Sequence, residues 1–190
     1  MALSGTEQCT DEQLVWNYQQ TGVAEPLEEL AQRHVSRVRS VLYAMVLNDA
    51  DADDLAQEVF IRAFRGLGRF NADAKFATWL YRITLNTARS FLSQQARSPL
   101  QSAEKVQDFP GARAHMPDGA VLSAELDREI ERALAALSVK LRAALVLTAI
   151  HGMPVREAAR AEGCATATMY WRIHEARKRV QQHLRAYLEP

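Results

Sequence analysis

Cysteine is scarce in this chain of 190 residues, which has only Cys9 and Cys164. Two cysteines make no disulfide framework at this length, so a reducing compartment is expected. Long apolar runs are also missing: the stretches around 41–47 and 143–150 fall far short of the ~20 residues that a membrane span needs. The N-terminus has neither a basic start nor an apolar run, so no secretory signal is expected. These absences predict a soluble, cytoplasmic protein without membrane insertion.

Net charge is absent as well, because 23 basic residues balance 23 acidic ones. The charges are nevertheless segregated along the chain: residues 1–61 carry −8, 62–98 carry +6, 99–137 carry −3 and 138–190 carry +5. Two separated basic blocks after an acidic one favour two surfaces for a polyanion, and a different partner for the acidic part. The alternative is that solvated helix faces merely cluster by charge.

Apolar residues recur at helical spacing, and no segment shows the period-two alternation of a strand. Residues 98–119 interrupt this pattern with three prolines and two glycines, which is typical of a flexible linker. The sequence therefore predicts an all-α fold of two small helical domains, 1–97 and 120–190, joined by that linker. The expected helices span about 27–45, 49–66, 74–95, 121–136, 139–151, 155–161 and 166–187.

The last two expected helices are a short one and a longer basic one, separated by a turn at Gly163. This order is typical of a helix-turn-helix. On the longer helix Trp171 lies about 200° from Met169 at about 100° per residue, almost opposite the apolar stripe. Side chains on such a face can reach base edges in the major groove, and neighbouring cations can neutralise phosphates. The alternative is a three-helix packing module whose outer face is merely solvated.

The N-terminal domain combines an acidic helix start with a basic and aromatic block. In residues 62–98, cations interleave with Phe70, Phe76, Trp79 and Tyr81, the combination that single-stranded nucleic acid requires. Trp79 alone is more simply explained as a core residue, because it shares an apolar stripe with Phe76. His34, also on an apolar stripe, is expected to be a partly buried core residue.

The chain resembles two conserved regions of bacterial sigma factors, in the extracytoplasmic-function (ECF) group of the sigma-70 family. The second region resembles DADDLAQEVFIRAFRGLGRF followed by FATWLYRITLNTARSFL, and the fourth resembles LRAALVLTAIHGMPVREAARAEGCATATMYWRIHEARKRVQQHL. Their order, spacing and intervening linker match, and together they cover most of residues 10–188. The resemblance implies an alternative sigma factor that binds core RNA polymerase and directs promoter-specific initiation. It further implies a region 2-like helical bundle, a region 4-like helix-turn-helix and no catalysis.

The resemblance also implies a role for particular residues. An acidic helix docks on the clamp of the largest polymerase subunit, and the flap is a further polymerase contact. Region 2 reads and melts the −10 element, and region 4 binds the −35 element as duplex. The residues expected at the clamp are Asp51, Asp53, Asp54, Gln57 and Glu58. Those expected at the −10 element are Arg62, Arg65, Lys75, Phe76, Arg82, Asn86 and Arg89. Those expected at the −35 element are Thr168, Tyr170, Trp171, Arg172, His174, Glu175, Arg177 and Lys178.

The expected partners are therefore core polymerase, promoter DNA and an anti-sigma factor that holds the protein inactive. Tyr170 and Trp171 stand where the family usually carries Lys or Arg and Ser. Glu175 can accept from cytosine N4, so an unusual −35 preference is expected.

Two other classes of protein compete with this interpretation. A dimeric helix-turn-helix regulator that acts without polymerase would explain residues 138–190, but would leave the acidic helix and the basic block of 62–98 unexplained. An enzyme or metal site at Cys164, with His151 and His174, lacks the paired spacing of a zinc site. The sequence also has no phosphate-binding loop or H-E-x-x-H motif, so no cofactor and no metal are expected.

Overall fold

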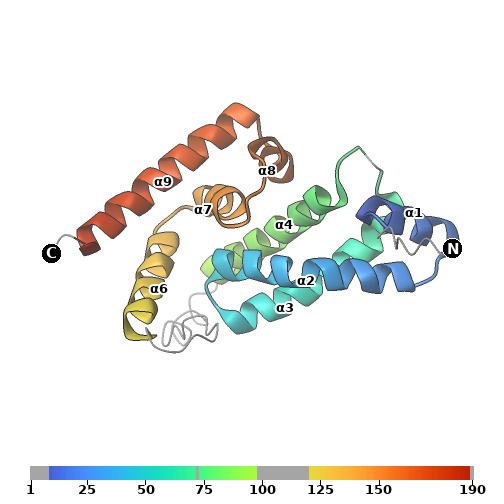
Figure 1. Cartoon of the computed structure of the whole chain (residues 1–190), viewed down its shortest axis with the longest axis horizontal. Helices are drawn as coiled ribbons and strands as arrows, with labels where there is room; N and C mark the ends of the chain where they lie inside the picture. The colour runs from blue at the N-terminus through green and yellow to red at the C-terminus, as the bar shows by residue number, and fades with distance from the viewer. Residues whose placement is uncertain (1–8, 72, 98–119, 189–190) are drawn as a thin grey trace, which may run out of the picture.

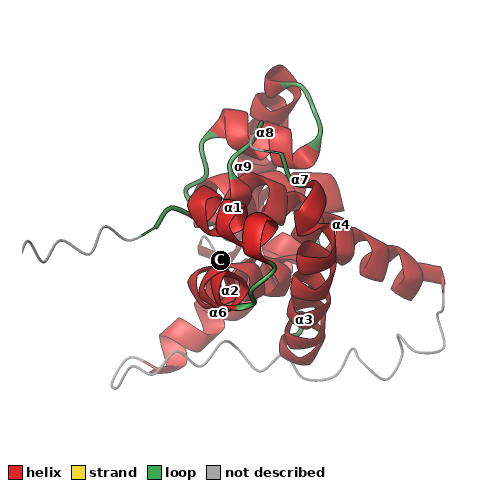
Figure 2. Cartoon of the chain, turned by 90° about the vertical axis from the view of Figure 1, so that its right-hand side faces the viewer, coloured by secondary structure: helices red, strands yellow, loops and turns green. Residues whose placement is uncertain are grey.

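The computed structural model describes residues 9–71, 73–97 and 120–188, and within these ranges the regular elements are all helical (Figures 1 and 2). The first group of helices contains α1 (Asp11–Thr21), α2 (Glu25–Val46), α3 (Asp49–Gly66), the short 3₁₀ helix η1 (Leu67–Arg69) and α4 (Phe76–Arg97). The expected all-α class is confirmed in the described part of the chain. The linker expected at 98–119 lies outside the described residues.

The second group contains α6 (Ala120–Ala135), α7 (Val139–Leu145), the π-helical turn η2 (Val146–Ile150), α8 (Val155–Glu162) and α9 (Thr166–Leu188). The expected helix over 139–151 is therefore α7 continued by η2. Gly163 ends α8 with φ = +63°, a left-handed conformation that glycine adopts without steric cost. Within the described residues, none of the helices is both long and apolar enough to cross a membrane.

The first helix, α1, is absent from the helices that apolar spacing predicts. Its signal is a capping box: the Thr10 side chain accepts a hydrogen bond from the Gln13 backbone N–H at 3.2 Å, and the Gln13 side chain accepts one from the Thr10 backbone N–H at 2.7 Å. Glu12 of α1 accepts a hydrogen bond from the backbone N–H of Phe76, the first residue of α4. The Gln19 amide donates to two carbonyls of the connection between α3 and α4. This helix therefore fixes the start of α4.

Replacing Thr10 with Ala should lower the free energy of unfolding by about 1 kcal/mol, because the hydrogen bond from the Gln13 backbone N–H to the Thr10 hydroxyl is lost. Urea denaturation followed by circular dichroism measures this change. Ser40→Ala is the control, since Ser40 lies exposed within α2 and such substitutions usually change stability by less than about 0.5 kcal/mol. Equal stability of the two variants would show that the capping box does not stabilise α1.

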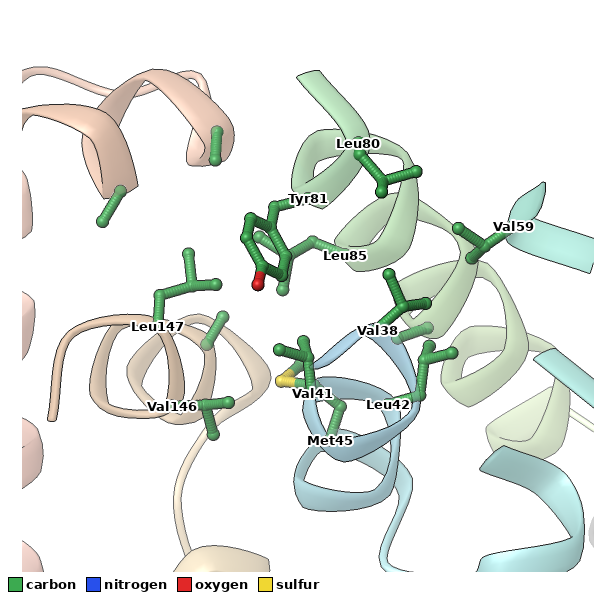
Figure 3. Close-up of a cluster of buried hydrophobic side chains, with 14 of the residues drawn as sticks. Val38, Val41, Leu42, Met45, Val59, Leu80, Tyr81, Leu85, Val146 and Leu147 are labelled. Atoms are coloured by element: carbon green, nitrogen blue, oxygen red, sulfur yellow. The ribbon is translucent and has the colours of Figure 1, made fainter. Parts of the chain in front are cut away.

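The two helical groups pack against each other. One cluster of buried residues joins Val41 and Met45 of α2 and Leu85 of α4 to Val146 and Leu147 of η2. Figure 3 shows the side chains of Val146 and Leu147 of η2 beside those of α2 and α4. This arrangement is compatible with the expected two helical domains. The sequence pattern did not predict that the two groups pack against each other.

Candidate polymerase-binding and nucleic-acid-binding surfaces

The outer face of α3 is acidic. Its apolar face is buried through Leu55, Val59 and Ala63, so residues about 180° away face solvent. Asp54 and Gln57 lie in the middle of that outer face and are exposed. Asn48 caps the helix by accepting a hydrogen bond from the Asp51 N–H at 2.9 Å. The carboxylates near this end also complement the helix dipole.

The five residues expected at the clamp are not equivalent. Asp53 is exposed but is held by Arg39 at 2.5 Å, and this hydrogen bond lowers the pKa of Asp53. Glu58 pairs with Arg62 one turn later, also at 2.5 Å. Asp51 is buried, at the edge of the core. The exposed part of the acidic face is therefore centred on Asp54.

Ile61 is a member of this face that sequence reasoning missed. It follows Gln57 by four residues and Asp54 by seven, and it is 51% exposed. An apolar side chain surrounded by polar ones resembles the centre of a protein–protein interface. The available signal was its position, since Ile61 lies outside the stripe formed by Leu55 and Val59.

One stripe of α4 carries a row of polar and cationic side chains. Arg82, Asn86 and Arg89 follow at helical spacing, and Lys75 precedes them just before the helix begins. The structure thus brings four of the residues expected at the −10 element to one face. That face lies against α8 of the second helical group, because Lys75, Arg82 and Arg89 all bond to α8 residues.

The other three residues expected at the −10 element have different environments. Arg65 is exposed. Arg62 is exposed too and bonds Glu58 and, more distantly, Thr87 of α4. Phe76 is fully buried, with its ring edge-on to His34 at 5.4 Å between centroids. In this structure Phe76 therefore supports the core rather than facing solvent.

Two core assignments made from the sequence are confirmed. His34 is 7% exposed, and its Nε2 lies 2.7 Å from Asp11 of α1. Trp79 is partly buried against the core, where its indole lies against Gly66 so closely that an added Cβ would be 3.3 Å away.

The outer face of α9 is aromatic and charged. Met169, Ile173 and Ala176 are buried, as the apolar stripe predicts. Tyr170 and Trp171 are 60% and 62% exposed. The remaining expected −35 residues with exposed side chains are Thr168, His174, Arg177 and Lys178.

Two of the residues expected at the −35 element already have partners. Arg179 donates a hydrogen bond to Glu175 at 2.7 Å, which lowers the pKa of Glu175 and keeps it ionised. Arg172 is 13% exposed in its side chain and pairs with Glu162 of α8 at 2.9 Å. Glu175 remains an acceptor on the outer face, whereas Arg172 fastens α9 to α8.

Neither a metal centre nor a redox site is suggested by the described residues. They contain no cluster of three or more His, Cys, Asp or Glu side chains able to hold a metal ion. Cys9 and Cys164 are both free thiols, and Cys164 packs against the core beside the helix-turn-helix turn.

Comparison with known proteins identifies both helical groups. Residues 30–98 match the family model of sigma-70 region 2, and residues 127–180 match that of sigma-70 region 4. The chain is 32% identical over 185 residues to the RNA polymerase sigma-H factor of Pseudomonas aeruginosa, covering 94% of this chain and 95% of that protein. It is 34% identical over 182 residues to the ECF RNA polymerase sigma-E factor of Escherichia coli K12, covering 92% and 94%.

Solved structures give the same result. The structure of CnrH in complex with the cytosolic domain of CnrY is similar with a TM-score of 0.69 and 25% identity, covering 93% of this chain and 97% of that one. The sigma factor RpoE of Bartonella quintana, solved with the anti-sigma factor NepR, shares the fold with the same TM-score and 23% identity, covering 86% and 98%. The chain therefore belongs to the ECF group of the sigma-70 family: it is a sigma factor that directs transcription and is not an enzyme.

Proposed function

We propose that this sigma factor presents three separate surfaces, one for core RNA polymerase and two for promoter DNA. The observation that carries the proposal is the separation of charge over the fold: an acidic face on α3, and cationic faces on α4 and α9, which belong to different helical groups. A protein that only bound duplex DNA would need only one of these three faces. Three surfaces suit a protein that joins an enzyme to two promoter elements.

The α3 face is the proposed docking site for the clamp of the largest polymerase subunit. The proposal is supported by Asp54 and Gln57, which are exposed, and by the neighbouring apolar Ile61. Acidic residues steer the encounter with a basic partner and suppress wrong partners. The apolar side chain adds burial at the centre of the contact. The flap remains a further proposed contact, for which no residue of this chain is assigned.

The polar stripe of α4 is the proposed reader of the melted −10 element. Lys75, Arg82 and Arg89 would follow the phosphate backbone, and Asn86 among them can donate and accept hydrogen bonds at a base edge. On α9, Trp171, His174 and Glu175 are the proposed −35 base contacts in the major groove. Arg177 and Lys178 are the proposed phosphate contacts beside them.

An anti-sigma factor is the proposed inhibitor, and the cytoplasm the proposed compartment. The support is that similar structures were solved with the cytosolic domain of CnrY and with the anti-sigma factor NepR. A dimeric regulator that works without polymerase explains α8 and α9 but gives no role to the acidic face of α3.

The test is run-off transcription with core polymerase on a promoter library. We expect the protein to co-elute with core polymerase in gel filtration at moderate salt and to select promoters with two conserved elements. The free protein should bind duplex DNA weakly, with an affinity that falls steeply as salt rises. Tight dimeric binding to a palindrome, without any complex with core polymerase, would instead establish the regulator.

A further inference from the structure

The outward surface of α1 carries no charge. Its exposed residues are Gln13, Trp16, Gln19, Gln20 and Thr21. The two acidic residues of this helix are partly buried and already bonded: Asp11 pairs with Arg33 of α2, and Glu12 accepts a hydrogen bond from the backbone N–H of Phe76. This surface therefore differs from the charged outer faces of α3 and α9.

Trp16 is the centre of this uncharged surface. Its side chain is 61% exposed, and it lies about 150° around the helix from the midpoint of the buried Leu14 and Val15. Gln13 and Gln20 lie on the same face, one turn before and one turn after it. A flat ring between two amides matches a nucleobase, which offers a π-face for stacking and hydrogen-bonding groups at its edges.

The indole lies on the side of α1 that borders the connection between α3 and α4. Glu12 holds the backbone N–H of Phe76 at 2.9 Å, and Gln19 donates to two carbonyls of that connection, both at 2.9 Å. Trp16 lies within about 60° of both Glu12 and Gln19 around the helix. Figure 1 shows α1 beside the start of α4. The uncharged surface thus continues into the region where the polar stripe of α4 begins.

The connection supplies the positive charge that α1 lacks. Arg69 and Lys75 are exposed on it, and its one acidic residue, Asp73, is bonded by Asn71. A single strand whose phosphates follow the stripe of α4 would reach Trp16 directly beyond Lys75. A protein partner fits less well, because the exposed residues of α1 include no aliphatic side chain, whereas the core of a protein interface is apolar.

We propose that Trp16 is a stacking platform for one unpaired base of the melted promoter, at the edge of the −10 element that lies at Lys75. The inference rests on the proposed function of region 2 and adds a contact outside α4. Gln13 and Gln20 flank the stacked base, and Arg69 and Lys75 neutralise the neighbouring phosphates. Every base has a π-face, so Trp16 stabilises the melted strand without selecting its sequence.

Photo-cross-linking reports directly on this contact. The holoenzyme is bound to a promoter selected from the library, with 5-iododeoxyuridine placed at successive positions across and beside the −10 element on each strand. Irradiation joins this base to an aromatic side chain on which it stacks. Peptide mass spectrometry should find Trp16 joined to one position at an edge of the −10 element. A scan that gives no cross-link to Trp16 at any position would overturn the proposal.

Two substitutions separate stacking from apolar contact. Trp16→Leu keeps an apolar side chain but removes the flat ring, so it should shorten the lifetime of the promoter complex about tenfold. Trp16→Tyr retains a flat ring and should stay within about twofold of the wild type. Neither should alter folding stability much, because the position is exposed. Dissociation after addition of a DNA competitor measures the lifetime, and an equal loss in both variants would refute stacking.

Val23→Ala is the matched control. Val23 follows α1 and is 53% exposed, but it has no ring, so its truncation should leave the lifetime unchanged. An abasic site at the cross-linked position provides a double-mutant cycle. Removing the base should shorten the lifetime for the wild type and cause no further loss in Trp16→Leu. Fully additive losses would show that the ring and the base act independently, and would overturn the proposal.

Failure of this inference is distinguishable from failure of the proposed function. If the wild type forms no promoter complex with core polymerase, the proposed function and this inference fail together. If wild-type complexes form and those of Trp16→Leu are equally long-lived, only the stacking is wrong. If Trp16→Leu weakens the binding of core polymerase in the absence of DNA, Trp16 contacts protein, which also overturns the inference and leaves the proposed function standing.

Discussion

Reversing the charge of the α3 outer face should reduce affinity for core polymerase by about 100-fold or more, because like charges across an interface cost several kcal/mol. The variant is Asp54→Lys with Gln57→Lys. Both positions are exposed and lie off the buried stripe, so the fold should be retained. Asp53 and Glu58 are left unchanged, since they already pair with Arg39 and Arg62. Fluorescence anisotropy with labelled protein measures the affinity.

The matched control is Glu125→Lys, a charge reversal at an exposed site of α6. It should leave polymerase affinity nearly unchanged, because α6 carries none of the residues that are proposed to contact polymerase. Thermal unfolding of both variants should stay close to that of the wild type, as for surface substitutions generally. Full polymerase affinity of the α3 variant would contradict the assignment of this face. Ile61→Ala should weaken binding more modestly, through lost apolar burial alone.

Substitutions on the outer face of α9 should change which −35 sequences are accepted. Trp171→Ala and Glu175→Gln should each alter base preference by about 1–3 kcal/mol, the discrimination of one good base contact. Glu175 is held ionised by Arg179, so it would accept from cytosine N4, and its loss should relax selection at that base. Selection from a promoter library with the reconstituted polymerase measures the preference.

Lys178→Ala is the control for this prediction. Because Lys178 is a proposed phosphate contact, this substitution should weaken binding to all promoters about equally and should reduce the dependence of the affinity on salt concentration. Truncating Trp171 should cost little stability, because the side chain is 62% exposed. An unaltered −35 preference in Trp171→Ala would refute base readout by this residue. It would point instead to an anchor for an anti-sigma helix, since exposed aromatic residues are favoured at interface hot spots.

The sequence predicted most helices and their buried faces. Met169 and Ile173 are buried and Trp171 is exposed, as their spacing along α9 requires. The face on which a helical residue lies depends only on its position along that helix, at about 100° per residue. For the same reason the acidic face of α3 and the polar stripe of α4 could be predicted without a structure.

The pattern of apolar and charged residues along the sequence did not predict two features of the structure, the helix α1 and the burial of Phe76. The helix α1 is weakly amphipathic, with Leu14 and Val15 buried, so apolar spacing did not reveal it. The capping box of Thr10 and Gln13 was the available signal. Phe76 was expected at the −10 element from the resemblance to region 2 of sigma factors. In the structure its side chain is fully buried, with its ring against that of His34 in α2. This burial depends on how α2 packs against α4, which the spacing of residues along α4 does not predict.

The sequence by itself therefore determined the helices, their apolar stripes, the charged faces and the membership of the ECF group. Only the tertiary structure decided which of these faces meet. Arg89 and Glu162 are 73 positions apart, and Arg142 and Met45 are 97 apart. No helical period relates residues so distant, and their pairing depends on how two helix groups bury a common apolar layer. The charge on α4 could thus be predicted from the sequence, but its occupation by α8 could not.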